Sequence, residues 1–176
     1  MIKNIIASRY SVALVNAFSD NELKALEKEV DFFVRFLHDN SEIEEFFLSP
    51  VIDDKIKKDV LDKLAEGLEI SQKFHNFLKV LIDKDRIYFL QDICKEIIRR
   101  IHGRLNIQDL ELVTARPISN EIVGKIRNFV SKYVSGEIHF THRIDKRIKG
   151  GFIAYNENLA VNASIENNLV NIEREF

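Results

Sequence analysis

The sequence predicts an α+β protein, in which an N-terminal six-helix bundle is followed by a small α/β module with a short sheet. Through about residue 105, apolar residues recur every three or four positions and Pro50 is the only proline, as is typical of packed helices. From about residue 107 the period changes to two, which indicates a strand. We therefore expect two domains, residues 1–105 and residues 106–176.

Two helix starts in the first domain are marked by side chains that can bind free backbone N–H groups. Ser19 and Glu22 match the capping box, in which the hydroxyl serves one N–H group and the carboxylate another. Ser41 and Glu44 match it again. Ser49-Pro50 then interrupts the chain. Further helices are predicted at about residues 53–65, 71–83 and 86–103.

The first helix has apolar residues on more than one face. Ile5, Val12 and Val15 lie off its main row, and in the helix at 71–83 Val80 likewise falls beside the main stripe. The main row of the first helix comprises Ile2, Ile6, Tyr10, Ala13 and Ala17. Two interpretations stand: a central helix of the bundle, or a groove on the bundle that receives another amphipathic helix.

The second domain begins with a strand around Leu110, which Pro117 ends. Ser119 can cap the next helix, which we expect to end near Gly136. Its apolar stripe comprises Ile122, Ile126, Phe129, Val130 and Tyr133. Another strand is expected around residues 138–140.

The end of the chain predicts a hairpin and a closing helix. Gly150 and Gly151 open a short apolar strand, residues 152–155, and the polar Asn156-Glu157-Asn158 turn reverses it. A second strand covers residues 159–163, and Ser164 stands where a helix N-cap belongs. The glycine pair lacks the spacing of a phosphate loop, and a strand follows it, so we expect close backbone approach or a tight bend there.

Composition and residue spacing argue against catalysis. The chain is 45% hydrophobic and 31% charged with a net charge of -2, which is ordinary globular composition without the footprint of a nucleic-acid binder. No nucleophile beside a base, paired acid and base, or phosphate loop is evident, so we expect no enzyme and no cofactor.

Cys94 falls on an apolar helix face and is expected to be a core thiol. His139 and His142, three apart in a strand, point to opposite faces and are not expected to share a metal.

Apolar runs near the N-terminus are interrupted by polar residues, so no membrane span is predicted, and membrane association is expected only through a partner.

A concentrated basic run is formed by Arg143, Lys146, Arg147 and Lys149, with Asp145 inside it. Three interpretations remain for this run: RNA binding, a solvated rim, or a charged surface for an acidic partner helix.

Several short motifs, in this order and spacing, resemble the delta-subunit family of F-type ATP synthase, whose mitochondrial relative is the oligomycin-sensitivity-conferring protein. They are Arg9-Tyr10-Ser11-Val12-Ala13-Leu14, Asp85-Arg86, Val113 to Ser119, Ile144-Asp145 to Gly150-Gly151, Asn162-Ala163-Ser164-Ile165, and Leu169. The likeness covers essentially the whole chain. Departures include Ser11 for the usual Ala, and Lys146 and Lys149 for Pro and Ile. We expect these to be surface or turn changes.

The resemblance implies a non-catalytic stator subunit of the peripheral stalk. It would link the catalytic head to the stalk, so that ion-driven rotation is coupled to ATP synthesis. Its partners would be the N-terminal helix of an α subunit and the ends of the b subunits, with no nucleic acid. It would lie at the cytoplasmic face of the bacterial plasma membrane and reach the membrane only through the complex.

The family's gripping surface implies a partner-binding site on the first and fifth helices. The site residues carried over are Tyr10, Ala13, Ala17, Val80 and Lys84. An alternative function is a small RNA- or protein-binding adaptor that uses the basic run 143–149.

Overall fold

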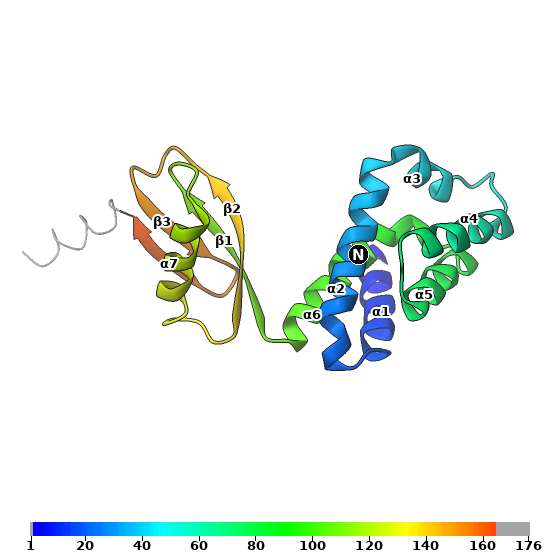
Figure 1. Ribbon diagram of the computed structural model, residues 1–176, viewed down its shortest axis with the longest axis horizontal. Coiled ribbons are helices and arrows are strands. Elements are labelled where there is room, and N and C mark those ends of the chain that lie inside the picture. The colour runs from blue at the N-terminus through cyan, green and yellow to red at the C-terminus, as the bar shows by residue number, and fades with distance from the viewer. Residues whose placement is uncertain (1, 165–176) are drawn as a thin grey trace, which may run out of the picture. The chain divides into compact units, whose positions relative to one another are not determined.

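The computed structural model describes residues 2–164 of the chain, which form helices first and a sheet second (Figure 1). Contacts divide the chain into two compact units, residues 1–104 and residues 105–176. The α+β class is therefore confirmed. Each unit has a core of its own.

The first unit consists of helices joined by short turns. Its elements are α1 (Ile2–Asn16), α2 (Asp20–Asp39), α3 (Ser41–Leu48), α4 (Asp54–Gly67), α5 (Gln72–Asp83), a 3-10 turn η1 (Ile87–Phe89) and α6 (Leu90–Arg104). The predicted stripe of α2 is buried, from Leu23 to Leu37, and α6 buries Ile93, Ile97 and Ile101. The predicted helices at 53–65, 71–83 and 86–103 are present, each shifted by a few residues at its ends.

Helix caps in this unit follow the sequence at some positions and not at others. Ser19 is the N-cap of α2, and the Glu22 carboxylate accepts its backbone N–H at 2.8 Å, as the capping box predicts. The predicted cap at Ser41 is wrong, because Asn40 occupies that position. Asn40 alone separates α2 from α3: its side-chain amide donates to the carbonyl oxygen of Phe36 at 2.7 Å, while its own carbonyl accepts from α3. One residue thus ends one helix and begins the next.

Cys94 lies in the core of the first unit, 1% exposed, as predicted. Burial raises the pKa of its thiol to about 12, because the apolar surroundings disfavour the charged thiolate. The thiol is therefore neutral and unreactive at physiological pH.

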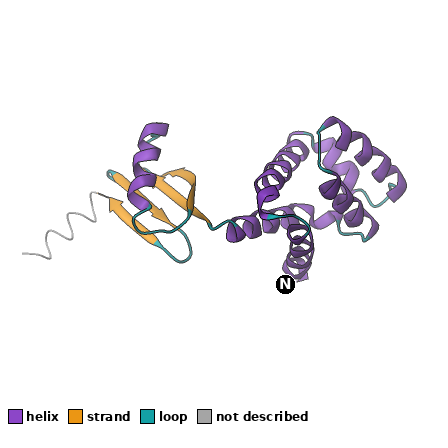
Figure 2. Ribbon diagram, turned by 60° about the horizontal axis from the view of Figure 1, so that its bottom comes forward, coloured by secondary structure: helices purple, strands orange, loops and turns teal. Residues whose placement is uncertain are grey.

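The second unit is a mixed sheet covered on one face by a helix (Figure 2). Its elements are β1 (Ile107–Thr114), α7 (Asn120–Val130), β2 (Glu137–Ile144), β3 (Gly151–Tyr155) and β4 (Ala160–Ser164). The strand order is β2-β1-β3-β4. Strands β1 and β2 are parallel and are joined through α7, whereas β3 pairs antiparallel with both β1 and β4.

Two boundaries in the second unit differ from the prediction. Helix α7 ends at Val130 and not near Gly136, because bonds of the tighter i to i+3 type close the chain after it: the N–H of Tyr133 donates to the carbonyl of Val130 at 2.9 Å. Of the predicted stripe of α7, only Ile126 and Val130 are buried. Ser164 is the last residue of β4, and the closing helix predicted after it lies outside the described residues.

Candidate partner-binding surface

Helices α1 and α5, on or next to which the predicted site residues lie, meet through an aromatic contact. The ring of Tyr10 on α1 packs edge-on against the ring of Phe77 on α5, with centroids 6.4 Å apart and planes at 67°. Farther along, the ammonium of Lys73 lies 4.7 Å above the ring of Phe18, which follows α1. The chain just after α1 thus meets an earlier residue of α5 than Tyr10 does.

We call the surface where Tyr10 of α1 meets Phe77 of α5 the α1–α5 seam. Beneath it, a row of aromatic rings also connects α5 to α2. Phe74 stacks on Phe77 with centroids 6.3 Å apart, and packs at 5.8 Å, nearly perpendicular, against Phe33 of α2. Offset and edge-to-face pairs of this kind contribute about 0.5–1.5 kcal/mol each beyond their buried area. Phe33 and Phe74 are fully buried, so the aromatic row is part of the core, and Tyr10 is its half-buried end at the surface.

Polar contacts hold α5 in place from both sides. On one side, the hydroxyl of its N-cap Ser71 donates to the carboxylate of Glu29 on α2 at 2.7 Å. On the other, Asp62 of α4 pairs with His75 and with Lys79, each at 2.6 Å. The hydrogen bond from Lys79 is the main reason that the pKa of Asp62 lies below its usual value. These contacts hold α5 in its position in the first unit without a bound partner.

The opposite side of α1 is used for contact with α6. The guanidinium of Arg100 donates to the hydroxyl of Ser11 at 2.9 Å and to that of Ser8 at 2.8 Å. Ser11 is fully buried, so the expectation that this departure from the family is a surface or turn change is wrong. Its hydroxyl satisfies the Arg100 guanidinium inside a helix interface, which an alanine could not do.

Each of the five predicted site residues is at least partly accessible. On α1, Tyr10 is half-buried and Ala13 is exposed, and Ala17, which directly follows the helix, is exposed as well. On α5, Val80 is 43% exposed, and Lys84 is the exposed C-cap of the helix. A surface formed by these residues presents small and apolar groups with one cation at its end.

The contact between Tyr10 and Phe77 separates these residues into two groups. Ala13 and Ala17 lie between the Tyr10 contact and the Phe18 contact, beside the Lys73–Phe77 segment of α5. Val80 and Lys84 come after the Tyr10 contact along α5. Tyr10 is the residue that connects the two groups.

Sequence reasoning missed two residues of this surface. Phe77 belongs to the predicted core stripe of α5, yet its ring is also the point where α5 meets Tyr10. Lys73 is exposed, bridges to Glu22 at 2.9 Å and covers Phe18. The available signal was spacing: Lys73, Phe77, Val80 and Lys84 follow one another at intervals of three or four residues along one side of the helix.

Another groove, of about 380 Å³, opens in the first unit at the junction of α2, α3 and α6. Leu37, Phe47, Ile87 and Leu90 line its apolar part, and Glu44 and Asp92 are among its charged residues. It contains none of the five predicted site residues. Because the contact between α1 and α5, and not this groove, carries the predicted residues, we take the surface at that contact as the candidate site.

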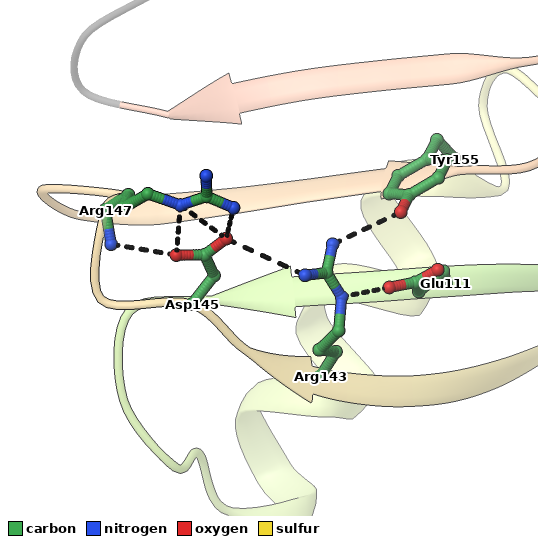
Figure 3. A network of polar contacts seen from close by, with 5 residues as sticks. All are labelled: Glu111, Arg143, Asp145, Arg147 and Tyr155. Atoms are coloured by element: carbon green, nitrogen blue, oxygen red, sulfur yellow. Dashed lines mark hydrogen bonds and ion pairs between the residues drawn. The ribbon is translucent and has the colours of Figure 1, made fainter.

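The two arginines of the basic run are paired with carboxylates (Figure 3). Arg143 pairs with Glu111 and donates to the hydroxyl of Tyr155 at 3.3 Å, while Arg147 pairs with Asp145 at 2.7 Å. Side-chain and backbone hydrogen bonds from Arg147 lower the pKa of Asp145 to about 2. With both arginines paired, this geometry gives no support to the RNA- or protein-binding adaptor.

The two histidines of β2 have separate partners, in line with their positions on opposite faces of the strand. His139 Nδ1 lies 3.4 Å from a carboxylate oxygen of Asp109, and His142 Nε2 lies 2.7 Å from the hydroxyl oxygen of Thr114. Among residues 2–164, no group of three or more His, Cys, Asp or Glu side chains could hold a metal ion. In the same part of the chain, no helix has the length and apolar character needed to cross a bilayer.

Comparison with known proteins connects this arrangement to one family. Residues 6–176 match the family model described as ATP synthase delta (OSCP) subunit. The ATP synthase subunit delta of Rickettsia bellii is 27% identical over 175 residues, covering 99% of this chain and 93% of that protein. The subunit delta of Clostridioides difficile is 28% identical over 171 residues, covering 94% and 92% of the two chains.

A solved structure supports the fold. A chain in the Toxoplasma gondii mitochondrial ATP synthase hexamer is similar with a TM-score of 0.67, over 96% of both chains. Sequence identity to that chain is 19%, so this likeness concerns the fold alone.

Proposed function

Because this chain belongs to the ATP synthase delta (OSCP) subunit family, whose members are non-catalytic components of the peripheral stalk, we propose that it grips the catalytic head with one unit and the stalk with the other. As a member of that family the chain is a stator subunit of F-type ATP synthase and is not itself an enzyme. The proposal concerns which surfaces bind which partners.

The first domain, residues 1–105, acts in this proposal as one six-helix bundle that binds the N-terminal helix of an α subunit. The observation that carries this assignment is the seam between α1 and α5, where Tyr10 and Phe77 pack together beside exposed small and apolar residues. Ala13 and Ala17 leave room for the backbone of a partner helix to approach closely. Val80 adds apolar surface at the other end of the seam.

The second domain, residues 106–176, holds the ends of the b subunits. The chain thus lies at the cytoplasmic face of the bacterial plasma membrane, and the complex provides its attachment there. With the head tethered to the stalk, the catalytic subunits cannot turn with the central rotor. Rotation of the central rotor, driven by the ion gradient, then changes the conformation of the catalytic sites. ATP synthesis is coupled to ion transport in this way.

Such a role requires affinity and no reactivity. A nanomolar contact corresponds to about 12 kcal/mol of binding free energy. A helix laid into an apolar seam is a recurring means of reaching such values, since the apolar face of the helix provides most of the contact.

Substitution Ala13→Asp tests the α-subunit contact. Burying an unpaired carboxylate under the partner helix is costly, so we expect the α-subunit N-terminal peptide to bind roughly 100-fold more weakly, or about 2.7 kcal/mol. Isothermal titration calorimetry of the full chain with that peptide measures the change.

The matched control is Ala25→Asp, the same substitution at an exposed alanine on α2. Both variants carry the same intrinsic helix cost, so a difference in peptide affinity reports the surface and not folding. Equal affinities for the Ala13→Asp variant and the unmodified chain would show that the α1–α5 seam is not the binding site.

A further inference from the structure

Helix α1 could pack into the first unit with either of two faces. The face that it buries consists of residues that are at most 5% exposed: Ala7, Ser11, Leu14 and Val15. The opposite row, on α1 and directly after it, is half-buried or exposed and comprises Ile6, Tyr10, Ala13 and Ala17. This outward row carries as much apolar side chain as the buried face. Burial of apolar surface alone therefore does not decide which face of α1 packs inward.

The buried face nevertheless contains a polar residue with specific partners. The hydroxyl of Ser11 donates to the carbonyl oxygen of Ser8, one turn earlier, at 2.9 Å. It also accepts a hydrogen bond from Nε of Arg100 on α6 at 2.9 Å, and the hydroxyl of Ser8 accepts one from Nη2 of Arg100 at 2.8 Å. Two hydroxyls of α1 thus bind one guanidinium.

Arg100 is held in this orientation by its own helix. The carboxylate of Glu96, one turn earlier on α6, lies 2.9 Å from Nη2 of Arg100. A guanidinium is planar and presents its N–H donors in a rigid fork. Its bonds to Ser8 and Ser11 can form together only when α1 is rotated so that both hydroxyls face α6. The contact therefore favours one rotation of α1 about its axis.

Arg104, one turn later on α6, makes a different kind of contact with α1. Its Nη1 donates to the backbone carbonyl of Val15 at 3.2 Å, and its Nε pairs with Asp20 at the start of α2 at 2.6 Å. Every rotation of a helix offers backbone carbonyls at its last turn. Arg104 thus fixes the end of α1, whereas Arg100 hydrogen-bonds to side chains that lie on one face of it.

We propose that Arg100 is a positioning residue, which through Ser8 and Ser11 fixes the rotation of α1 that turns Tyr10 and Ala13 toward the surface for the partner helix. A buried polar contact can select one helix arrangement among several with similar apolar burial. This inference rests on the proposed function and adds to it a residue that lies outside the binding surface and keeps that surface available.

Thiol labelling measures the rotation of α1 directly. Ala13→Cys places a thiol on the outward row and Ala7→Cys places one on the buried face, while the native Cys94 is buried and unreactive. In the otherwise unmodified chain, position 13 should react with a maleimide much faster than position 7. In an Arg100→Met background, the ratio of the two rates should fall about tenfold or more, because the rotated helix covers position 13 and exposes position 7.

The matched control is Arg35→Met, which removes a guanidinium that pairs with Asp31 of its own helix at 2.7 Å and is 74% exposed. We expect the ratio of labelling rates to stay unchanged in this variant. A double variant, Ser8→Ala with Ser11→Ala, removes both acceptors from α1 and leaves α6 intact. It should lower the ratio as Arg100→Met does, and it replaces that variant if Arg100→Met does not fold. Alanine is the better helix former, so a lower ratio would not come from a weakened helix.

Titration of the full chain with the α-subunit N-terminal peptide provides the binding readout. If the outward rotation falls to about one tenth of the population in Arg100→Met, the peptide should bind about tenfold more weakly. A lower labelling ratio with unchanged peptide affinity would overturn the inference.

A purely structural role for Arg100 would give a different result. In that case Arg100→Met and the double serine variant would lower the unfolding free energy, but the labelling ratio would stay unchanged, and the inference would be wrong. Equal acceleration at positions 7 and 13 would indicate unfolding of α1 and would also overturn it. Failure of the peptide to bind the unmodified chain would instead remove the α-subunit contact of the proposed function, while the labelling ratio would still decide whether Arg100 sets the rotation.

Discussion

At the scale of single residues, Glu22 shows how one carboxylate connects three parts of the first unit. It accepts hydrogen bonds from the backbone N–H and the hydroxyl of Ser19, at 2.8 and 2.7 Å, and so caps α2. It also pairs with Lys73 of α5 at 2.9 Å. The backbone hydrogen bond from Ser19, followed by the contact with Lys73, lowers the pKa of Glu22 to about 2.

This lowered pKa predicts an acid-sensitive contribution to stability. Because the folded pKa of Glu22 lies below its usual value of 4.5, its contribution is complete above about pH 4.5 and is lost as the pH falls toward 2. The unmodified chain should therefore be more stable than Glu22→Gln at pH 7, and the difference should disappear near pH 2. Urea unfolding followed by circular dichroism at several pH values measures it.

The matched control for this experiment is Glu66→Gln. Glu66 is exposed near the end of α4 and makes no ion pair among the described residues. We expect little change with this variant at either pH. A stability difference for Glu22→Gln that is as large at pH 2 as at pH 7 would show that the carboxylate charge is not responsible.

At the scale of elements, the β3–β4 hairpin depends on a glycine. Gly151 has a φ of +81°, and a Cβ atom built there would lie 2.2 Å from the carbonyl oxygen of Ala163 on β4. Gly124 in α7 is the opposite case, since a Cβ atom there would meet nothing within 4 Å. The sequence-based expectation of close backbone approach at the glycine pair is confirmed for Gly151.

These two glycines predict opposite effects of the same substitution. Gly151→Ala must displace the backbone of β4 or strain its own, so we expect the second unit to lose more than about 2 kcal/mol of stability. Gly124→Ala should raise stability by up to about 1 kcal/mol, because alanine is the better helix former. Chemical denaturation of both variants, with hydrogen exchange at β3 and β4, measures the two changes.

Equal stabilities for the two variants would contradict this account of the hairpin. Protection of the β3 and β4 amides should fall only in Gly151→Ala, because Gly124 lies outside the hairpin.

At the scale of the whole molecule, the sequence predicts the class of fold and the order of elements well. Periodicity separates helices from strands because apolar side chains must face a core, and this constraint acts on local sequence. Cys94 and the capping box at Ser19 follow from local rules and are confirmed. The family likewise follows from collinear motifs, and the family match over residues 6–176 confirms it.

What the sequence does not provide is the pairing of distant elements. The burial of Ser11 depends on Arg100, which lies 89 positions away, and no local pattern reveals that contact. The division of the five site residues into two groups depends on the contact between Tyr10 and Phe77, which lie 67 positions apart in the chain. The exposed flank of α7 has the same cause: its stripe is apolar throughout, but a sheet can bury only the side that faces it.

The most direct test of the central claim is co-purification of the tagged full chain from membranes of its own organism. After mild detergent solubilisation, we expect the chain to bring down the α and b subunits in constant proportion. Stripping the catalytic head from the membranes should release the chain with it. Recovery of the chain in ribosomal or free soluble fractions, without α and b subunits, would contradict its role as the link between head and stalk.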